Sequence, residues 1–117
     1  MKILVTGGTG YIGSHTVVEL QAKGFEVVIV DNLSNSSSDI VEKISEISGI
    51  IPKLEIFDLT NKDLVADFFS RNNDIVGIIH FAAYKAVGES VNKPLLYYRN
   101  NIESLINVME GMQTNGI

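Results

Sequence analysis

The chain has 117 residues, a formal net charge of −5 and no cysteine. This length suits one domain with a substantial hydrophobic core. The negative charge argues against nucleic acid or an anionic membrane as partner, and the lack of cysteine excludes disulfides and thiolate metal sites. The sequence opens without a signal-peptide pattern, and no apolar run approaches the roughly 20 residues of a membrane span, so we expect a cytoplasmic protein.

The first predicted strand, residues 2–6, is a continuous apolar run of the kind found in parallel sheets covered on both faces. A glycine-rich bend follows, in which Gly7, Gly10 and Gly13 are spaced G-x-x-G-x-x-G, a variant of the dinucleotide-binding fingerprint. Glycines turn sharply and leave the main chain open to a pyrophosphate, while the helix predicted for residues 11–23 offers its N-terminal amides. We expect Gly13 to allow close packing of helix and strand. The residues of this helix predicted to point inward are Ile12, Thr16, Val17 and Leu20.

An acidic residue follows the second predicted strand, residues 26–30. Asp31 lies about 20 residues beyond the glycine-rich bend, where a carboxylate can accept hydrogen bonds from adenosine ribose hydroxyls. A carboxylate there repels a 2′-phosphate, so the pattern favours NAD over NADP. The alternative is an ordinary turn with a solvated aspartate. The order of strand, bend, helix and acid favours the cofactor interpretation.

A polar loop, residues 32–38, leads to a helix predicted over residues 39–48 and ended by Gly49. The loop follows the carboxyl end of a strand, where ligands bind in open α/β sheets. It also contains Ser37 and Ser38, either of which can cap the helix. The residues of this helix predicted to point inward are Ile40, Val41, Ile44 and Ile47.

The third predicted strand, residues 54–57, precedes a second acid at a strand end. Asp58 could accept a hydrogen bond from an adenine amino group, or it could cap the local turn. A third helix is predicted to begin near Thr60 or Asn61, and a fourth strand over residues 75–80. The residues of the third helix predicted to share one face are Leu64, Val65, Phe68 and Phe69.

Small residues follow the fourth strand in the segment FAAYK, residues 81–85. They would allow close approach of a ring or ribose, and Lys85 could meet a phosphate or ribose oxygen. A tight packing corner with a surface lysine is an equal alternative. Pro94 is suited to open the last helix. The apolar residues that recur along it at helical spacing, which we interpret as packing surface, are Ile102, Leu105, Ile106, Met109 and Met112.

The alternation of four strands and four helices predicts a parallel sheet, because crossover connections are right-handed. With the glycine bend after the first strand, the strand order should be 3-2-1-4, and the cofactor crevice should lie between strands one and four. We interpret residues 1–117 as the N-terminal part of a Rossmann-like, doubly wound α/β domain that lacks its later strands and a substrate domain.

Catalytic groups are not evident from the residues. His15 and His80 have no partner at metal-ligand spacing, so packed or hydrogen-bonded histidines are the expected roles. None of the four tyrosines is followed four positions later by a lysine. The sequence thus predicts nucleotide binding but no catalytic residue and no metal site.

Four segments together resemble the N-terminal part of UDP-glucose 4-epimerases, members of the extended short-chain dehydrogenase/reductase superfamily. They are TGGTGYIGSHT (6–16), VDNLSNSS (30–37), HFAAYKAVGESV (80–91) and YYRNN (97–101). The first segment alone would indicate only the superfamily, whereas the others in register with it point to the epimerases. The resemblance covers essentially the whole chain.

This resemblance implies NAD as cofactor and assigns residues to its site. Those at the pyrophosphate would be Gly7, Gly10, Tyr11, Ile12 and Gly13. Those around the adenosine ribose would be Asp31, Asn32, Asn35 and Ser36, with Leu33 also in the cofactor site. Asp58 and Leu59 would flank the adenine. Those toward the nicotinamide would be Phe81, Ala82, Ala83 and Lys85, with Asn100 near the cofactor on the final helix.

The family interconverts UDP-glucose and UDP-galactose by reversible hydride transfer at sugar C4, assisted by a Tyr-x-x-x-Lys pair and a nearby serine or threonine. This sequence lacks that pair, so the resemblance implies an N-terminal fragment that is inactive alone. The full-length protein would take a UDP-sugar and form a homodimer, for which the apolar face of the final helix is a candidate surface; burial against its own sheet is an alternative. Competing interpretations are a related nucleotide-sugar dehydratase or reductase, and a non-catalytic NAD-binding sensor module.

Overall fold

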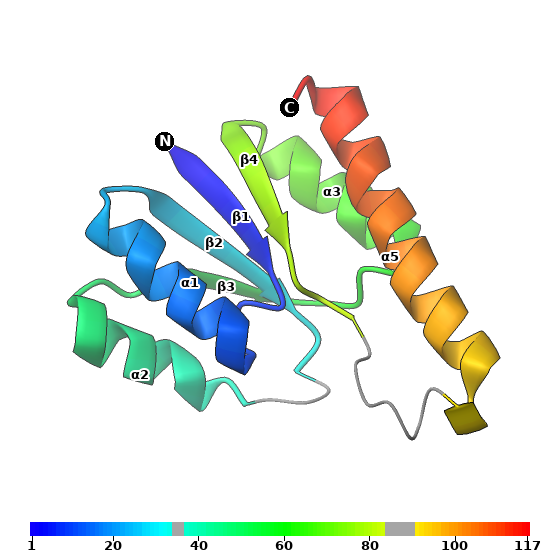
Figure 1. The fold of residues 1–117 in the computed structure, drawn as a ribbon. Helices are drawn as coiled ribbons and strands as arrows, with labels where there is room; N and C mark the ends of the chain where they lie inside the picture. The colour runs from blue at the N-terminus through cyan, green and yellow to red at the C-terminus, as the bar shows by residue number, and fades with distance from the viewer. Residues whose placement is uncertain (34–36, 84–90) are drawn as a thin grey trace. The chain divides into compact units, whose positions relative to one another are not determined.

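The computed structural model describes residues 1–33, 37–83 and 91–117, in which strands and helices alternate (Figure 1). The order predicted from the sequence is confirmed, with bounds that differ by one or two residues. The strands are β1 (Lys2–Thr6), β2 (Glu26–Asp31), β3 (Lys53–Ile56) and β4 (Ile75–His80). The helices are α1 (Tyr11–Ala22), α2 (Asp39–Ser48), α3 (Lys62–Arg71) and α5 (Pro94–Asn115).

The strands form one parallel sheet with the order β3-β2-β1-β4. Val5 of β1 is in register with Ile29 of β2 on one side and with Ile79 of β4 on the other. The predicted order 3-2-1-4 is therefore confirmed, and the fold is Rossmann-like. In such a sheet the carboxyl ends of the strands lie at one edge, where ligands bind.

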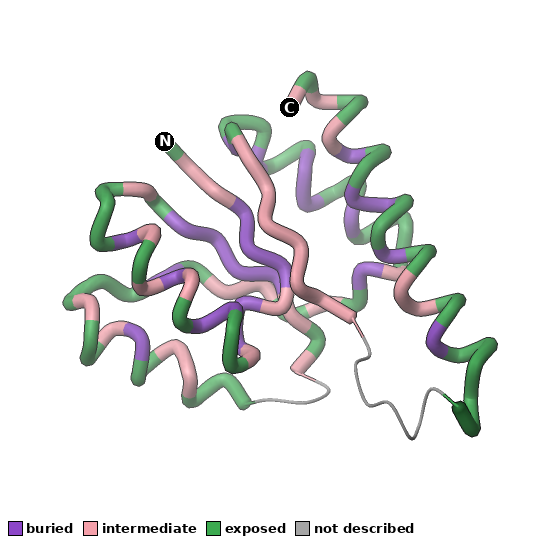
Figure 2. The backbone as a smooth tube through the Cα atoms, in the orientation of Figure 1, coloured by how far each residue is buried: buried purple, intermediate pink, exposed green. Residues whose placement is uncertain are grey.

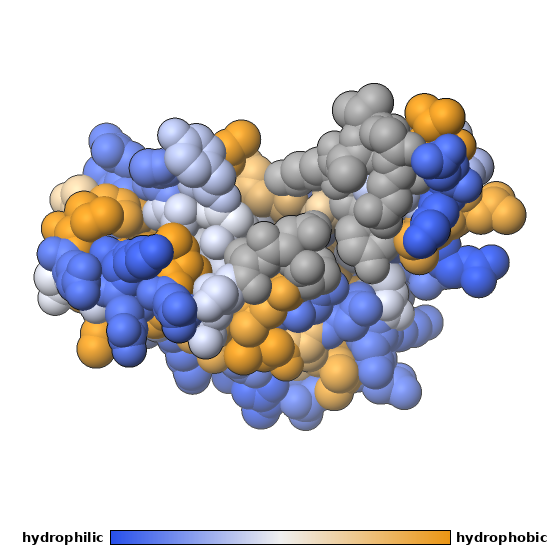
Figure 3. Space-filling model, turned by 90° about the horizontal axis from the view of Figure 1, so that it is seen from below, coloured by the Kyte–Doolittle hydropathy of each residue, from blue (hydrophilic) through white to orange (hydrophobic). Residues whose placement is uncertain are grey.

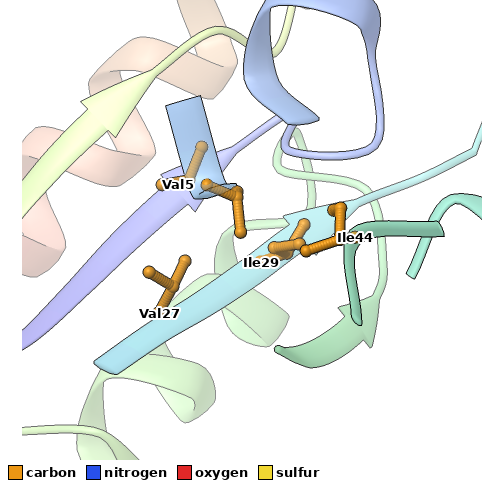
Figure 4. Close-up of a cluster of buried hydrophobic side chains, with 5 residues drawn as sticks. Val5, Val27, Ile29 and Ile44 are labelled. Carbon is orange, nitrogen blue, oxygen red and sulfur yellow. The ribbon is translucent and has the colours of Figure 1, made fainter. Parts of the chain in front are cut away.

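One compact unit comprises Met1–Phe57 and Asp74–Phe81 and contains the whole sheet with α1 and α2. Both helices lie on the same face of the sheet (Figure 1). Figure 4 shows the core beneath them, where strand side chains approach Ile44 of α2. The residues of this cluster are Val5, Val17, Val27, Ile29 and Ile44, each at most 3% exposed. Full burial of such a side chain contributes about 1.5–3 kcal/mol, so this cluster fixes the two helices on the sheet.

Two of the predicted inward positions of α1 and α2 are wrong. Ile12 is 58% exposed and Ile47 is 73% exposed, whereas Val17 and Ile44 are buried. Both exposed residues lie in the terminal turns of their helices, while the buried ones come from the middle turns. Apolar periodicity identifies a helix face but not how much of its length a sheet covers.

The other compact unit comprises Asp58–Asn73 and Ala82–Ile117, in which α3 packs against α5. The helices approach closely at Gly111, where an added Cβ would lie 2.2 Å from Cδ2 of Phe69. Asn107 of α5 donates a hydrogen bond of 2.8 Å to the carbonyl of Leu59, just before α3. The predicted inward face of α3 is mostly confirmed. Val65, Phe68 and Phe69 are buried, whereas Leu64 is 43% exposed.

The apolar stripe of α5 does not pack against α3, and four of its five residues are exposed, whereas Met112 is half-buried. Figure 2 shows buried positions recurring along α5 between exposed ones. The buried residues are Tyr97, Ser104, Asn107, Val108 and Gly111. The exposed apolar residues of the stripe are Ile102, Leu105, Ile106 and Met109, between 43% and 57% exposed. The side of the helix that carries Asn107 and Gly111 faces its neighbour, and the Phe69 ring occupies the space beside Gly111.

No helix in the described ranges combines the length and the apolar character needed to cross a membrane.

Candidate functional site

The glycine-rich bend joins β1 to α1 and is fastened to the end of β2. Gly7 has a φ of 69°, a left-handed conformation that glycine adopts without steric cost. Its amide donates a hydrogen bond of 2.9 Å to the carbonyl of Val30, and the amide of Gly10 donates one of 3.1 Å to the carbonyl of Gly7. The bend is therefore a defined turn at the carboxyl edge of the sheet.

Gly13 in the first turn of α1 lies against the bend itself. An added Cβ there would be 2.2 Å from the carbonyl oxygen of Gly7 and 2.9 Å from Cα of Gly8. At Gly10 the nearest such atom is the Gly7 oxygen at 3.4 Å, an ordinary contact. Of these two positions, only Gly13 is required by packing, whereas Gly10 keeps the surface of the bend free of side-chain atoms.

The N-terminus of α1 opens on the bend without a side-chain cap, since its N-cap residue is Gly10. The first amides of a helix have no partner within the helix, and they carry a partial positive charge. Tyr11 and Ile12 in this turn are 82% and 58% exposed, and the Tyr11 ring meets His15 edge-on at 4.7 Å. Uncapped amides at a glycine-rich bend suit a phosphate or diphosphate.

Asp31 lies beside this bend, as the sequence predicted. Its Oδ2 accepts hydrogen bonds from Thr9, at 3.2 Å from the amide nitrogen and 2.6 Å from the hydroxyl oxygen. Its Oδ1 accepts one of 2.8 Å from the amide of Leu33, which has a φ of 60°. Thr9 was missed by the sequence analysis because nothing local in the sequence marks a contact between residues 22 positions apart.

Other predicted site residues of the sheet-containing unit lie at the same edge. The amide of Phe81 donates a hydrogen bond of 3.0 Å to the carbonyl of Thr6, so it extends the pairing of β4 with β1. Oγ1 of Thr6 and Nδ1 of His80 are 2.6 Å apart, which confirms a hydrogen-bonded role for this histidine. Asn32 is exposed and Leu33 is half-buried.

The remaining predicted residues belong to the unit that contains α3 and α5. Oδ1 of Asp58 accepts hydrogen bonds of 2.9 and 2.8 Å from the amide and hydroxyl of Thr60, so the aspartate does cap its turn, although its side chain remains exposed. Leu59 is 6% exposed, and its carbonyl is bonded to Asn107. Asn100 is half-buried and donates a hydrogen bond of 3.1 Å to Asn101. Ala82 and Ala83 are also half-buried.

Three predicted contacts, Asn35, Ser36 and Lys85, lie outside the described residues.

Figure 3 views the protein from below the sheet of Figure 1, which is the side toward which the strands run. It shows hydrophobic patches between hydrophilic ones on this side. Within the described ranges, no group of three or more histidine, aspartate or glutamate side chains could hold a metal ion. The site thus offers main-chain amides and one oriented carboxylate.

Comparison with known proteins agrees with this geometry. The profile of the NAD dependent epimerase/dehydratase family matches residues 3–117. The chain belongs to this family. The UDP-glucose 4-epimerase of Bacillus subtilis is 48% identical over 117 residues, which are 100% of this chain and 34% of that protein. The UDP-glucose 4-epimerase uge1 of Schizosaccharomyces pombe is 50% identical over 111 residues, 95% of this chain and 31% of that protein.

Solved structures of family members share the fold. The crystal structure of UDP-glucose 4-epimerase from Bifidobacterium longum in complex with NAD+ and UDP superposes with a TM-score of 0.95 at 42% identity, over 100% of this chain and 35% of that one. The enzyme from Stenotrophomonas maltophila, with bound NAD and formylated UDP-arabinopyranose, superposes with a TM-score of 0.94 at 44% identity, over 100% of this chain and 34% of that one. The chain therefore spans about a third of the length of these relatives.

Proposed function

We propose that these residues form the NAD-binding N-terminal part of a UDP-glucose 4-epimerase, which interconverts UDP-glucose and UDP-galactose through a 4-keto intermediate. The observation that carries the proposal is the pairing of an uncapped helix N-terminus with Asp31 across one glycine bend. The similarity of the whole chain to UDP-glucose 4-epimerases supports the choice of reaction.

In this proposal each half of the adenosine diphosphate moiety meets a different group. The first-turn amides of α1, at Tyr11, Ile12 and Gly13, bind the pyrophosphate, because their partial positive charge is not used by a capping side chain. Asp31 accepts a hydrogen bond from the ribose and disfavours a 2′-phosphate by charge repulsion. Bound NAD supplies the acceptor for the hydride that leaves the sugar.

The other predicted contacts complete the same proposed site. They are Gly7, Gly10, Asn32, Leu33, Asn35, Ser36, Asp58, Leu59, Phe81, Ala82, Ala83, Lys85 and Asn100. We infer that both compact units belong to one NAD-binding domain. The capping bonds of Asp58 leave its Oδ2 as the oxygen for an adenine amino group.

Catalysis needs a proton donor and acceptor near the sugar, and the Tyr-x-x-x-Lys pair that supplies them in the family has no counterpart among the four tyrosines here. We therefore expect the 117 residues by themselves to show no turnover of UDP-galactose. Turnover by the purified 117-residue chain would contradict this part of the proposal.

The binding proposal is tested by calorimetric titration of the complete protein with NAD and with NADP. We expect NAD to bind more tightly, and Asp31→Asn to weaken NAD binding by about tenfold, equal to about 1.4 kcal/mol. The same variant should reduce the preference for NAD over NADP. Asp74→Asn is the matched control, because that carboxylate bonds Lys2 just before β4, away from the carboxyl ends of the strands. Unchanged affinities of Asp31→Asn for both nucleotides would remove Asp31 from the ribose site.

We also propose that the complete protein forms a homodimer through the exposed apolar face of α5. Four large apolar side chains at helical spacing remain 43% to 57% exposed on this one helix, and burial between two copies would remove them from water. Leu105→Glu should convert the dimer to a monomer in sedimentation velocity, because it places charge in that face. Gln113→Glu, at an exposed polar position of the same helix, should leave the dimer intact. A wild-type protein that stays monomeric at high concentration would refute this proposal.

A further inference from the structure

The carboxylate of Asp31 is largely occupied by its own chain. An ionised carboxylate has about four lone-pair positions for hydrogen bonds. Two donors from Thr9 fill those of Oδ2, and the amide of Leu33 fills one on Oδ1. Donors on both oxygens fix the rotation of the carboxylate before any ligand arrives. One acceptor position is left, and it belongs to Oδ1.

The contact with the Thr9 hydroxyl is the strongest of the three by its geometry. At 2.6 Å it lies in the range of charge-assisted O–H···O⁻ hydrogen bonds. Thr9 is only 3% exposed, so water competes poorly for its hydroxyl. Thr9 also stands between Gly8 and Gly10, and the same bond therefore holds the glycine bend to the end of β2.

We propose that Thr9 is a positioning residue for recognition of the adenosine ribose. Its hydroxyl and amide hold Oδ2, so Oδ1 presents the remaining acceptor position to a ribose hydroxyl. An acceptor that is already oriented spares the ligand the cost of ordering it, which is how preorganisation raises affinity. This inference rests on the proposed NAD site and adds to it a residue that acts through Asp31.

The first test replaces the hydroxyl and measures NAD affinity of the complete protein by calorimetry. Thr9→Val keeps the shape and the amide but removes the hydroxyl, and we expect the Kd for NAD to rise about tenfold, equal to about 1.4 kcal/mol. Thr9→Ser restores the hydroxyl and should stay within about threefold of wild type. If Thr9→Val does not fold, as judged by circular dichroism, Thr9→Ala gives the same comparison.

The second test separates positioning from general damage to the bend. In an Asp31→Ala background Thr9 has no carboxylate to orient, so Thr9→Val should change the Kd by less than about twofold there. A structural role of the hydroxyl that does not act through Asp31 would weaken binding equally in both backgrounds. That result, or a Thr9→Val protein with wild-type affinity, would overturn the inference while leaving the NAD site intact. A wild-type protein that binds no NAD would instead overturn the proposed function and this inference with it.

Discussion

Gly13→Ala tests whether the glycine bend and α1 are packed as closely as the structure shows. Two effects of opposite sign compete. Alanine in a helix is favoured over glycine by about 1 kcal/mol. Against this, the new Cβ would sit 2.2 Å from the Gly7 carbonyl oxygen, and the two atoms must separate by nearly an ångström. Overpacking costs about 1–3 kcal/mol, and the upper end applies here because a main-chain carbonyl cannot rotate away as a side chain can.

The clash should therefore outweigh the gain in helix propensity, and Gly13→Ala should lower the free energy of unfolding by about 2 kcal/mol. The assay is urea unfolding of the complete protein without added NAD, followed by circular dichroism. The slope exceeds the ~1–3 kcal/mol/M that is typical of small proteins, because the complete protein is larger, so the midpoint should fall by roughly 0.5 M. A midpoint equal to or above that of the wild type would show that helix propensity dominates, and it would refute the close packing of Gly13 on the bend.

Gly10→Ala is the matched control in the same bend. Its Cβ would meet the nearest atom at 3.4 Å, so packing tolerates it. Alanine is a poorer N-cap than glycine, and we expect a loss of only about 0.5 kcal/mol. In the proposed site, however, the added methyl group stands where the pyrophosphate approaches, so NAD affinity should fall although the fold is retained. The two variants thus separate packing from ligand access within one motif.

Two further predictions concern stability. Asn107→Leu should cost about 1–3 kcal/mol in urea unfolding, because it leaves the buried carbonyl of Leu59 without its donor. No loss of stability would show that another donor replaces the amide. Asp74→Asn should lower the Tm slightly at neutral pH, because the hydrogen bond from Lys2 holds the pKa of Asp74 below its ordinary 3.8. That stabilisation is fully present above pH 3.8 and is lost as the pH falls through the lower folded pKa, so the two proteins should melt alike in stronger acid. A Tm difference that persists there would refute the role of the charge.

Much of the fold could be predicted from the sequence, because the patterns that determine it act on neighbouring residues. The glycine bend, the apolar strands and Pro94 at the start of α5 each constrain their own backbone, and the structure confirms them. The parallel sheet followed from the handedness of crossover connections, and the strand order from the glycine bend after the first strand. Gly49 ends α2 as predicted, with a left-handed φ of 78°.

The missed features are contacts between distant segments. Periodicity located the apolar face of α5 but could not tell which side its neighbour covers. The neighbour covers the side of Gly111, where the Phe69 ring lies in the space that a side chain would need. Likewise, the sequence marked Asp31 as a ribose ligand, whereas its hydrogen bonds to Thr9 arise only when β2 is laid beside β1 and brings the strand end to the bend.

The sequence by itself thus determined the class of fold, the position of the bend and the acid that follows the second strand, because glycine spacing and apolar periodicity act on a few neighbouring residues. Only the tertiary structure decided which face of α5 stays exposed, why residue 13 must lack a side chain, and how the Asp31 carboxylate is held. Each of those depends on atoms that packing, rather than chain order, makes neighbours.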